Sequence, residues 1–246
     1  ISFGIAFVAG RKRVPRPAAG ITAFIRFEDM PFTLANATPR GDERRLASMS
    51  DDITNDKRAL RAELRERRQL LTPAQHAAAE QGLADQLRAL LANLGVQSLS
   101  CYLSARTEPS TRTFLNWATA EGIRVLLPVT RADGLLDWAV AHTDGTETEG
   151  LFGMPEPEGE LLGPIAVNDV DLMIVPAASI DKTGMRLGWG RGYFDKTLGS
   201  MERRPPVYAV VFDSEVVESV PRELHDQGVT GVVTPTYTLT FEDVRR

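Results

Sequence analysis

The spacing of leucines predicts two consecutive helices in the first half of the chain. Residues 55–71 are expected to form the first, with one apolar face built from Leu60, Leu64 and Leu71. Thr72 is a typical N-cap and Pro73 suits the first helical position, so a second helix is expected to begin there. Gly95 is a typical helix end. The stripe before it predicts a face packed in the core: Leu83, Leu87, Leu90, Leu91 and Leu94.

Beyond this helix pair, short apolar runs alternate with helical segments. Strands are predicted at residues 97–103, 123–127, 136–141, 171–175, 207–212 and 229–233, and helices at residues 110–121 and 193–199. Strands that alternate with helices indicate a largely parallel sheet covered on both faces. The pattern therefore predicts one α/β domain, a three-layer α/β/α architecture of Rossmann-like type, and we find no internal repeat.

A glycine-rich string breaks this pattern between the strand at 171–175 and the helix at 193–199. Residues 186–195 read Arg-Leu-Gly-Trp-Gly-Arg-Gly-Tyr-Phe-Asp. Three glycines in five positions weaken a strand and a helix alike, so we expect a loop with special backbone angles or close approach to a ligand. Backbone N–H groups, Arg186, Arg191 and the Asp195 carboxylate together favour a site for a phosphate with Mg²⁺.

Other interpretations of this string are weaker. The P-loop pattern G-x-x-x-x-G-K-[ST] is absent from the chain, and the spacing here is G-x-G-x-G instead of the dinucleotide fingerprint G-x-G-x-x-G. A glycine-rich surface turn with scattered charges stays the plain alternative. The position of the loop, between the end of a strand and the start of a helix, favours a ligand site, because open α/β sheets bind ligands there.

Composition limits the possible functions. The chain has 246 residues, 43% hydrophobic and 25% charged, which is ordinary for a globular protein able to bury a core. The net charge of −5 argues against a general nucleic-acid surface. Cys101 is the single cysteine, lies in an apolar run, and is predicted to be a buried inert thiol in a reducing, cytoplasmic setting. The histidines lack metal-ligand spacing, which argues against a zinc site.

The first 48 residues differ from the rest of the chain. They are more basic than acidic, and prolines and glycines interrupt any long element. Their short apolar start precedes the basic residues, whereas a secretory signal has the opposite order, and a membrane span needs about 20 apolar residues. Residues 1–48 are therefore predicted to be a disordered or non-native extension, with Met30 or Met49 as the natural start. A targeting peptide or docking arm is the alternative.

The glycine string resembles the signature of the 5-formyltetrahydrofolate cyclo-ligase family, Arg-Leu-Gly-x-Gly-x-Gly-Tyr-[Tyr/Phe]-Asp preceded by Asp-x-x-Gly. Further segments are similar to that family in order and spacing, from about residue 55 to residue 236: Asp56 to Arg61, Tyr102 to Ser104 with Glu108 to Thr111, Phe152 to Pro157, His225-Asp226, and Val232 to Pro235. The resemblance implies a cyclo-ligase domain over residues 50–241 with the family's α/β fold. Trp189, where the family has Tyr or a basic residue, and Arg191, where it has Gly or Lys, are departures.

The resemblance also implies a reaction and its cofactors. The family closes 5-formyltetrahydrofolate to 5,10-methenyltetrahydrofolate with ATP and Mg²⁺, releasing ADP and phosphate through a phosphorylated formyl intermediate. It implies small-molecule substrates, no nucleic acid, no membrane and a monomer.

Residue roles follow from the resemblance position by position. Arg186 and Arg191 would be catalytic, and Asp195 and Asp226 would bind the metal. Glu108, Phe152, Met154 and Tyr193 would contact the folate. ATP would be held by Lys57, Arg58, Arg61 and the loop residues Arg186, Leu187, Gly188, Trp189, Gly190, Arg191, Gly192, Tyr193 and Phe194. The residues alone leave the basic positions 57–68 open, because a helix carrying Glu63 and Glu66 beside them could also present a solvated face.

Rival functions use the same features differently. A sugar-phosphate isomerase or CoA-transferase-like enzyme on a similar fold needs a carboxylate near a phosphate loop but no ATP. A non-catalytic folate- or nucleotide-binding protein would not need a metal ligand beside the loop. An RNA-binding module could use the basic helix, although the acidic body and the lack of an RNP-like aromatic motif count against it.

We expect a chain that lacks residues 1–48 to keep its full turnover, because the residues that resemble the family begin near residue 55. Steady-state rates of the full and shortened chains check this. A large loss in the shortened chain would mean that the extension forms part of the site.

Overall fold

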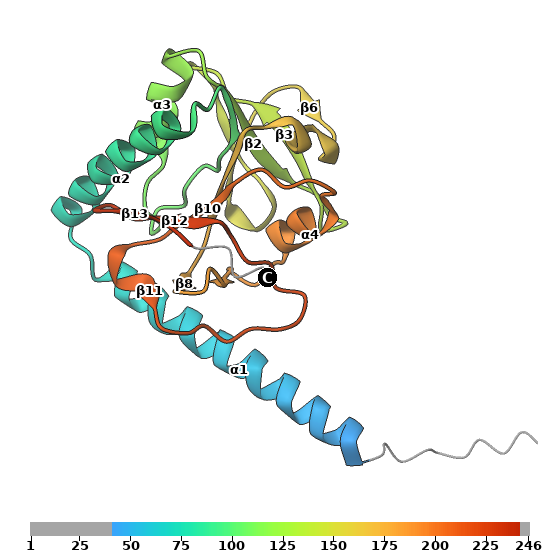
Figure 1. Cartoon of the computed structure of the whole chain (residues 1–246). Coiled ribbons are helices and arrows are strands. Elements are labelled where there is room, and N and C mark those ends of the chain that lie inside the picture. The colour runs from blue at the N-terminus through green and yellow to red at the C-terminus, as the bar shows by residue number, and fades with distance from the viewer. Residues whose placement is uncertain (1–40, 242–246) are drawn as a thin grey trace, which may run out of the picture. The chain divides into compact units, whose positions relative to one another are not determined.

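The computed structural model describes residues 41–241, with side chains from residue 51 onward (Figure 1). Residues 1–40, most of the predicted extension, lie outside the described residues. The remaining residues of that extension, 41–48, belong to helix α1, which spans Gly41–Gln69. The helix therefore begins earlier than the expected residue 55. The boundary of the domain at residue 50 stays a prediction.

An eight-stranded sheet forms the centre of the fold, in the order β13-β12-β10-β7-β1-β2-β3-β6. The strands from β12 to β2 are parallel, and β13, β3 and β6 join the edges in antiparallel orientation. The strands are β1 (Ser98–Ser100), β2 (Arg124–Thr130), β3 (Leu136–Val140), β6 (Leu161–Leu162), β7 (Leu172–Pro176), β10 (Val207–Val210), β12 (Gly231–Val233) and β13 (Thr238–Thr240). The predicted largely parallel sheet is confirmed.

Helices cover the two faces of this sheet (Figure 1). Helices α2 (Pro73–Leu94) and α3 (Arg112–Ala120) pack on one face, against side chains such as Val125 and Leu127 of β2. Helix α4 (Tyr193–Ser200) and the 3-10 segment Pro164–Asp169 pack on the other face, against Leu126. Neighbouring residues of β2 point to opposite faces because side chains alternate along a strand. This is the predicted α/β/α sandwich.

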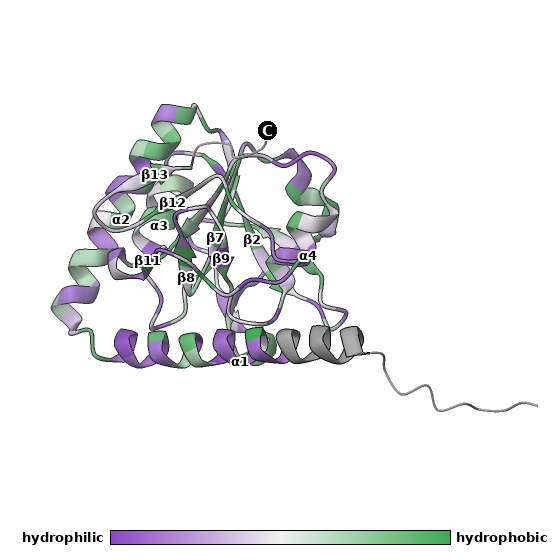
Figure 2. Cartoon of the chain, turned by 60° about the horizontal axis from the view of Figure 1, so that its bottom comes forward, coloured by the Kyte–Doolittle hydropathy of each residue, from purple (hydrophilic) through white to green (hydrophobic). Residues whose placement is uncertain are grey.

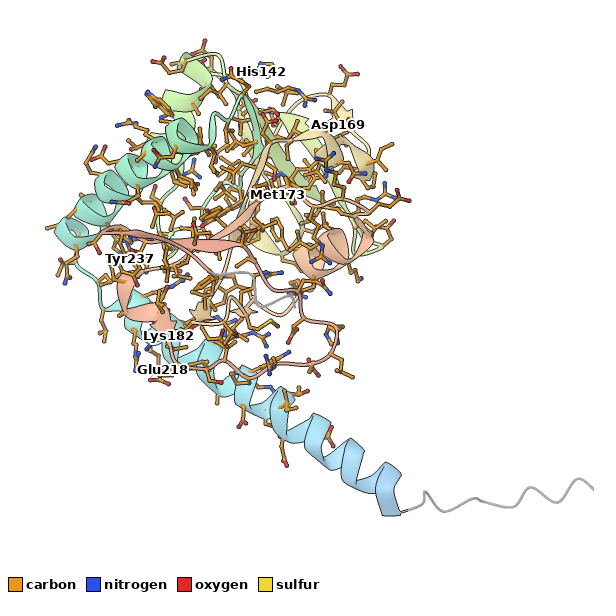
Figure 3. All side chains as sticks on the ribbon, in the orientation of Figure 1. His142, Asp169, Met173, Lys182, Glu218 and Tyr237 are labelled. Atoms are coloured by element: carbon orange, nitrogen blue, oxygen red, sulfur yellow. The ribbon has the colours of Figure 1, made fainter. Side chains whose placement is uncertain are left out.

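A second, smaller sheet packs beside helix α1. Its order is β11 (Val216–Val217), β8 (Ser179–Asp181) and β9 (Arg186–Leu187). Leu64 of α1 is buried against Ala178, Leu187 and Val220, which makes a separate apolar cluster. Figure 3 shows the ion-paired Lys182 and Glu218 at this outer side, and Met173 inside the main sheet. Helix α1 is largely hydrophilic, with hydrophobic positions at intervals (Figure 2), as one buried face requires.

Helix α2 follows its sequence signals closely. The Thr72 hydroxyl accepts from the Gln75 amide at 3.3 Å, and the Gln75 side chain accepts from the Thr72 amide at 2.8 Å. This reciprocal pair is a capping box. Gly95 ends the helix with φ of +66°, a backbone angle that glycine adopts at little cost. The leucine stripe is buried except Leu94, which is 46% exposed because it lies in the last turn.

The shortest elements escaped prediction. The small sheet, strand β6, strand β13 and the hairpin of β4 (Glu147–Glu149) and β5 (Pro155–Pro157) have two or three residues per strand. Such strands are too short to show an alternating pattern. The strand expected at 97–103 covers only Ser98–Ser100, since the chain after it turns toward a cavity. Cys101 is fully buried, as predicted, and burial raises its pKa to about 12.

A buried ion pair fastens α1 to the rest of the chain. Arg68, in the last turn of α1, donates from Nε and Nη2 to the two carboxylate oxygens of Glu215 at 2.6 and 2.7 Å. Its Nη2 also donates to the Ala177 carbonyl at 3.1 Å. Glu215 further accepts from the Phe212 amide at 2.8 Å. Both side chains are almost fully buried, and within the described residues their hydrogen bonds go to each other and to backbone groups, while Nη1 of Arg68 has no partner.

Removing Arg68 should lower the free energy of unfolding by about 3–5 kcal/mol, because Glu215 would be left buried without its partner. Arg67→Ala is the matched control. Arg67 pairs with Glu63 on the exposed side of the same helix turn, and such pairs contribute about 0–1 kcal/mol. Urea unfolding of Arg68→Ala and Arg67→Ala measures both values. Equal losses in the two variants would contradict this account.

Candidate active site

A cavity of about 470 Å³ opens where the central parallel strands end. Its walls include Tyr102 after β1, Thr130 at the end of β2 and Pro176 at the end of β7. Open α/β sheets bind ligands at this edge. Most of the residues predicted from the sequence line it: Glu108, Phe152, Met154, Arg186, Gly188, Trp189, Arg191, Gly192, Tyr193, Phe194 and Asp195.

The glycine loop forms one wall of the cavity. It leaves β9 after Leu187 and enters α4 at Tyr193. Gly190 and Gly192 have φ of +95° and +72°, angles that a side chain would strain. A Cβ at Gly188 would come within 3.0 Å of the Arg186 guanidinium. Gly190 and Gly192 are therefore required for their positive φ angles, and Gly188 is required because the Arg186 side chain lies close to it.

Arg186 and Asp195 tie the two ends of this loop together. Arg186 Nη2 donates to Asp195 Oδ1 at 2.8 Å, and the arginine side chain is 2% exposed. The same carboxylate oxygen accepts from the Gln227 amide at 3.3 Å. Burial lowers the pKa of Arg186, and the charges of Asp195 and Asp226 oppose that shift. Asp195 Oδ2 makes no hydrogen bond within residues 51–241, so it is available to a ligand.

Among the basic side chains at positions 57–68 of α1, three are buried or half-buried, Lys57, Arg61 and Arg68, and three are exposed, Arg58, Arg65 and Arg67. Lys57 is buried and donates to Asp226 at 2.6 Å and to Glu223 at 2.7 Å. Arg61 Nε donates to the Gly188 carbonyl at 2.8 Å. Arg65 lines the cavity, and its guanidinium lies 5.3 Å from the centre of the Trp189 ring. Arg58 is exposed and does not line the cavity.

Acidic groups gather beside the loop. Carboxylate oxygens of Glu223 and Asp226 and a ring nitrogen of His225 lie within 4.8 Å of one another. Asp226 Oδ2 accepts from Lys57 and from the Glu223 amide, whereas Oδ1 has no hydrogen bond in the described part of the chain. The amide of Gln227, the residue after Asp226, donates to Asp195 Oδ1, which brings Asp195 next to this segment. Two carboxylates, each with one unengaged oxygen, suit Mg²⁺, which takes one or two carboxylates beside phosphate and water.

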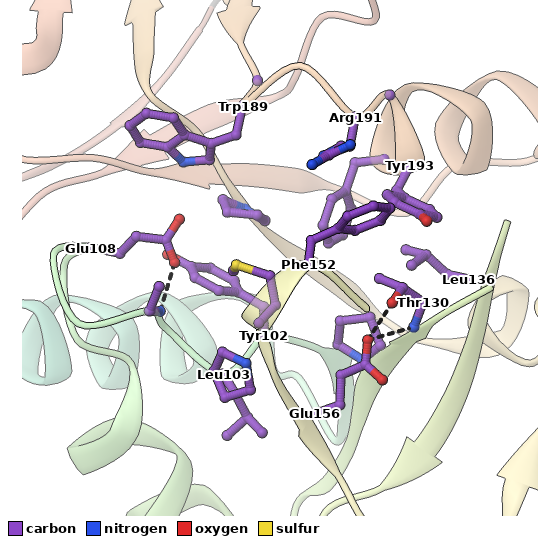
Figure 4. A pocket seen from close by; sticks show the side chains of 18 of the residues that line it. Tyr102, Leu103, Glu108, Thr130, Leu136, Phe152, Glu156, Trp189, Arg191 and Tyr193 are labelled. Atoms are coloured by element: carbon purple, nitrogen blue, oxygen red, sulfur yellow. Dashed lines mark hydrogen bonds between the residues drawn. The ribbon is translucent and has the colours of Figure 1, made fainter. Parts of the chain in front are cut away.

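Glu108 marks the opposite side of the cavity. It is 6% exposed, and Oε2 accepts from the Ala105 amide at 2.9 Å. Burial raises its pKa, and the Ala105 amide, the charge of Arg68 and the Trp189 indole act in the opposite direction. Figure 4 shows Glu108, Tyr102 and Trp189 on one side of the cavity, with Phe152, Arg191 and Tyr193 on another.

The segment between β4 and β5 lines another side of the cavity. Phe152 has φ of +68°, which is strained for a residue with a side chain, and it is 55% exposed. The Arg191 guanidinium lies 3.7 Å from the centre of the Phe152 ring. Behind it, Glu156 accepts from the amide of Thr130 at 2.9 Å and from its hydroxyl, and Gly150 leaves room for that carboxylate. These contacts hold this segment against β2.

Some residues differ from expectation. Leu187 is buried below the loop, and Lys57, Arg61, Gly190 and Asp226 lie behind the cavity wall without lining it. Sequence analysis did not find the lining residues Arg65, Tyr102, Thr130 and Glu156 as site residues. Tyr102 could have been found from its place at the end of a strand, but Thr130 and Glu156 carried no pattern of their own.

Comparisons with known proteins agree with this geometry. The model of the 5-formyltetrahydrofolate cyclo-ligase family matches residues 53–235. The 5-formyltetrahydrofolate cyclo-ligase of Mycolicibacterium smegmatis is 34% identical over 165 residues, covering 64% of this chain and 84% of its own length. That of Escherichia coli K12 is 28% identical over 177 residues, covering 70% and 96%.

Solved structures give the same fold. The 5,10-methenyltetrahydrofolate synthetase of Aquifex aeolicus superposes with a TM-score of 0.65 at 25% identity, over 77% of this chain and 95% of that chain. The synthetase of Mycoplasma pneumoniae, 19% identical over 73% of this chain and 99% of that chain, shares the fold with a TM-score of 0.59. Because the family match spans most of the described residues and the signature loop lines the cavity, this chain belongs to the 5-formyltetrahydrofolate cyclo-ligase family.

Proposed function

We propose that this chain uses ATP to close 5-formyltetrahydrofolate to 5,10-methenyltetrahydrofolate, with release of ADP and phosphate. The observation that carries this proposal is a single cavity with a glycine loop and buried Arg186 at one side and the buried Glu108 carboxylate at another. A phosphate donor and a flat heterocycle could meet there. Membership of the family supports the same activity.

The chemistry explains why ATP is needed. The N5-formyl group is an amide, and its oxygen is a poor leaving group. Transfer of the γ-phosphoryl group to that oxygen makes phosphate the leaving group. N10 of the folate then attacks the formyl carbon and loses its proton, the new C–N bond forms, and the C–O bond breaks as phosphate departs. No protein nucleophile is required, which agrees with the buried thiol of Cys101.

Phosphoryl transfer requires mainly positioning and positive charge from the protein. Arg186 and Arg191 would hold the transferred phosphoryl group, with the amides of Gly188, Gly190 and Gly192. Lys57, Arg58 and Arg61 would contact the rest of the triphosphate. Support comes from Arg61, which donates to the Gly188 carbonyl of the loop, although none of these three side chains lines the cavity.

Asp195 and Asp226 would hold Mg²⁺ through their unengaged oxygens. Mg²⁺, when bound, neutralises the charge of the phosphates. Within the chain itself, Lys57 keeps Asp226 in place and Arg186 keeps Asp195 in place, at 2.6 and 2.8 Å. Glu108 would accept hydrogen bonds from the pterin ring, and Phe152, Met154 and Tyr193 would offer apolar surface to the folate. A monomer and a cytoplasmic location belong to the same proposal.

Two rival functions predict different dependence on ATP and different turnover. A sugar-phosphate isomerase or CoA-transferase-like enzyme would act without ATP, and a folate- or nucleotide-binding protein would bind without turnover. The family match favours neither. None of the helices in the described part of the chain has the length and apolar content that a membrane span requires.

Near-UV absorbance tests the proposed reaction directly. Purified protein mixed with 5-formyltetrahydrofolate, ATP and Mg²⁺ should produce the absorbance of the methenyl product. Leaving out ATP, or adding EDTA in excess, should abolish the rise, and added Mg²⁺ should restore it. Binding of both substrates without any rise would overturn the catalytic assignment.

Arg191→Ala and Asp195→Asn should each lower turnover by about 100-fold or more, since each removes charge from the phosphoryl-transfer site. Arg124→Ala, at the start of β2, and Asp144→Asn, on an exposed loop, are matched controls that should keep normal rates. Thermal unfolding of all four variants separates lost catalysis from lost folding. Near-normal turnover in either loop variant would refute the loop assignment.

A further inference from the structure

Two polar atoms beside Glu108 have no hydrogen-bond partner within the described residues. They are the hydroxyl of Tyr102 and the indole nitrogen of Trp189. Tyr102 is 4% exposed and the nitrogen of Trp189 is inaccessible to solvent, yet both residues line the cavity. A buried donor without a partner costs free energy, so such groups are expected to meet a ligand or water.

The indole of Trp189 is held in a fixed orientation. The guanidinium of Arg65 lies 5.3 Å from the centre of its ring, and that of Arg68 lies 4.8 Å away. Arg68 is itself locked by its two hydrogen bonds to Glu215. The N–H of Trp189 is therefore preorganised and lies close enough to Glu108 to act on its carboxyl group, although the geometry falls short of a hydrogen bond.

The hydroxyl of Tyr102 keeps its proton. Burial raises the pKa of Tyr102 well above 10, and the charge of Glu108 raises it further. Tyr102 therefore presents a neutral O–H group, which both donates and accepts. Together with the N–H of Trp189 and the second oxygen of Glu108, it forms an array of acceptor and donors on one side of the cavity (Figure 4).

We infer that Tyr102 and Trp189 are specificity-determining residues that read the 2-amino-4-oxopyrimidine edge of the folate together with Glu108. That edge carries an amino group and a ring N–H, which suit the carboxylate, and a carbonyl and ring nitrogen, which suit the hydroxyl and the indole N–H. The inference rests on the proposed function. In this assignment the side chain of Trp189 contacts the folate, while the backbone of residue 189 remains part of the phosphate loop.

Tyr102→Phe and Trp189→Phe remove these donors and keep an aromatic ring. Each should raise the KM and the dissociation constant for 5-formyltetrahydrofolate about 2- to 13-fold, the effect of one lost hydrogen bond. The KM for ATP should stay within a factor of two, about the scatter of such measurements. Unfolding in urea without ligand should show Tyr102→Phe to be as stable as the parent or more stable, because the hydroxyl has no partner to lose.

Tyr208→Phe and Trp138→Phe are matched controls. Both residues are buried outside the cavity, the Tyr208 hydroxyl bonds to Thr240, and the Trp138 nitrogen is also unpartnered. They should leave the KM for the folate unchanged. If the control variants weaken folate binding as much as the cavity variants, or Tyr102→Phe lowers stability without changing folate binding, the inference is wrong.

A shortened ligand locates the contact. 5-Formyltetrahydropterin, which lacks the aminobenzoylglutamate half, should lose affinity for Tyr102→Phe and Trp189→Phe by the same factor as the whole substrate. Loss with the whole substrate alone would place the contacts at the tail and overturn the inference. These binding measurements need no turnover. A parent chain that binds folate without forming product would therefore refute the proposed function while still deciding this inference.

Discussion

The buried pair of Arg68 and Glu215 is the contact on which the site depends. It fastens the end of helix α1 to the segment after β10, and the same guanidinium packs on the ring of Trp189. One side chain thus joins a helix, a turn and the glycine loop. Buried ion pairs add little net stability compared with apolar residues of the same size. Its contribution here is to hold the end of α1 beside the loop, because one guanidinium contacts both Glu215 and the Trp189 ring.

The position of α1 against the loop matters because the loop is rich in glycine. Gly188, Gly190 and Gly192 let the loop backbone adopt the conformation that a phosphate site needs. The same glycines resist little against other conformations, so contacts from other segments must hold the loop in place. Arg61 binds the Gly188 carbonyl, and Arg186 and Asp195 close the two ends of the loop. Every one of these contacts uses a charged group that is buried or half-buried. The charges that would serve catalysis therefore also build the fold.

The cavity separates two kinds of chemistry within about 470 Å³. Cations and backbone amides gather at the glycine loop, whereas Glu108 and Tyr102, together with the indole that Trp189 contributes from the loop, offer a neutral and anionic array. Between them the lining is largely apolar and includes Phe152. Such walls can bind a phosphate donor and a heterocycle in different parts of the cavity, and the reacting atoms can meet where the walls join.

The sequence by itself determined the layered α/β fold, the cap and end of α2, and the glycine loop that forms one wall of the cavity. These features carry local signals, which are leucine periodicity, Thr72 and Gly95 at helix ends, and glycines that no regular element tolerates. Only the tertiary structure decided that Arg61 of α1 meets the glycine loop, that Arg68 meets Glu215, and that Tyr102 and Trp189 lie beside Glu108. These contacts join residues distant along the chain, and their partners follow from packing, which no local pattern encodes.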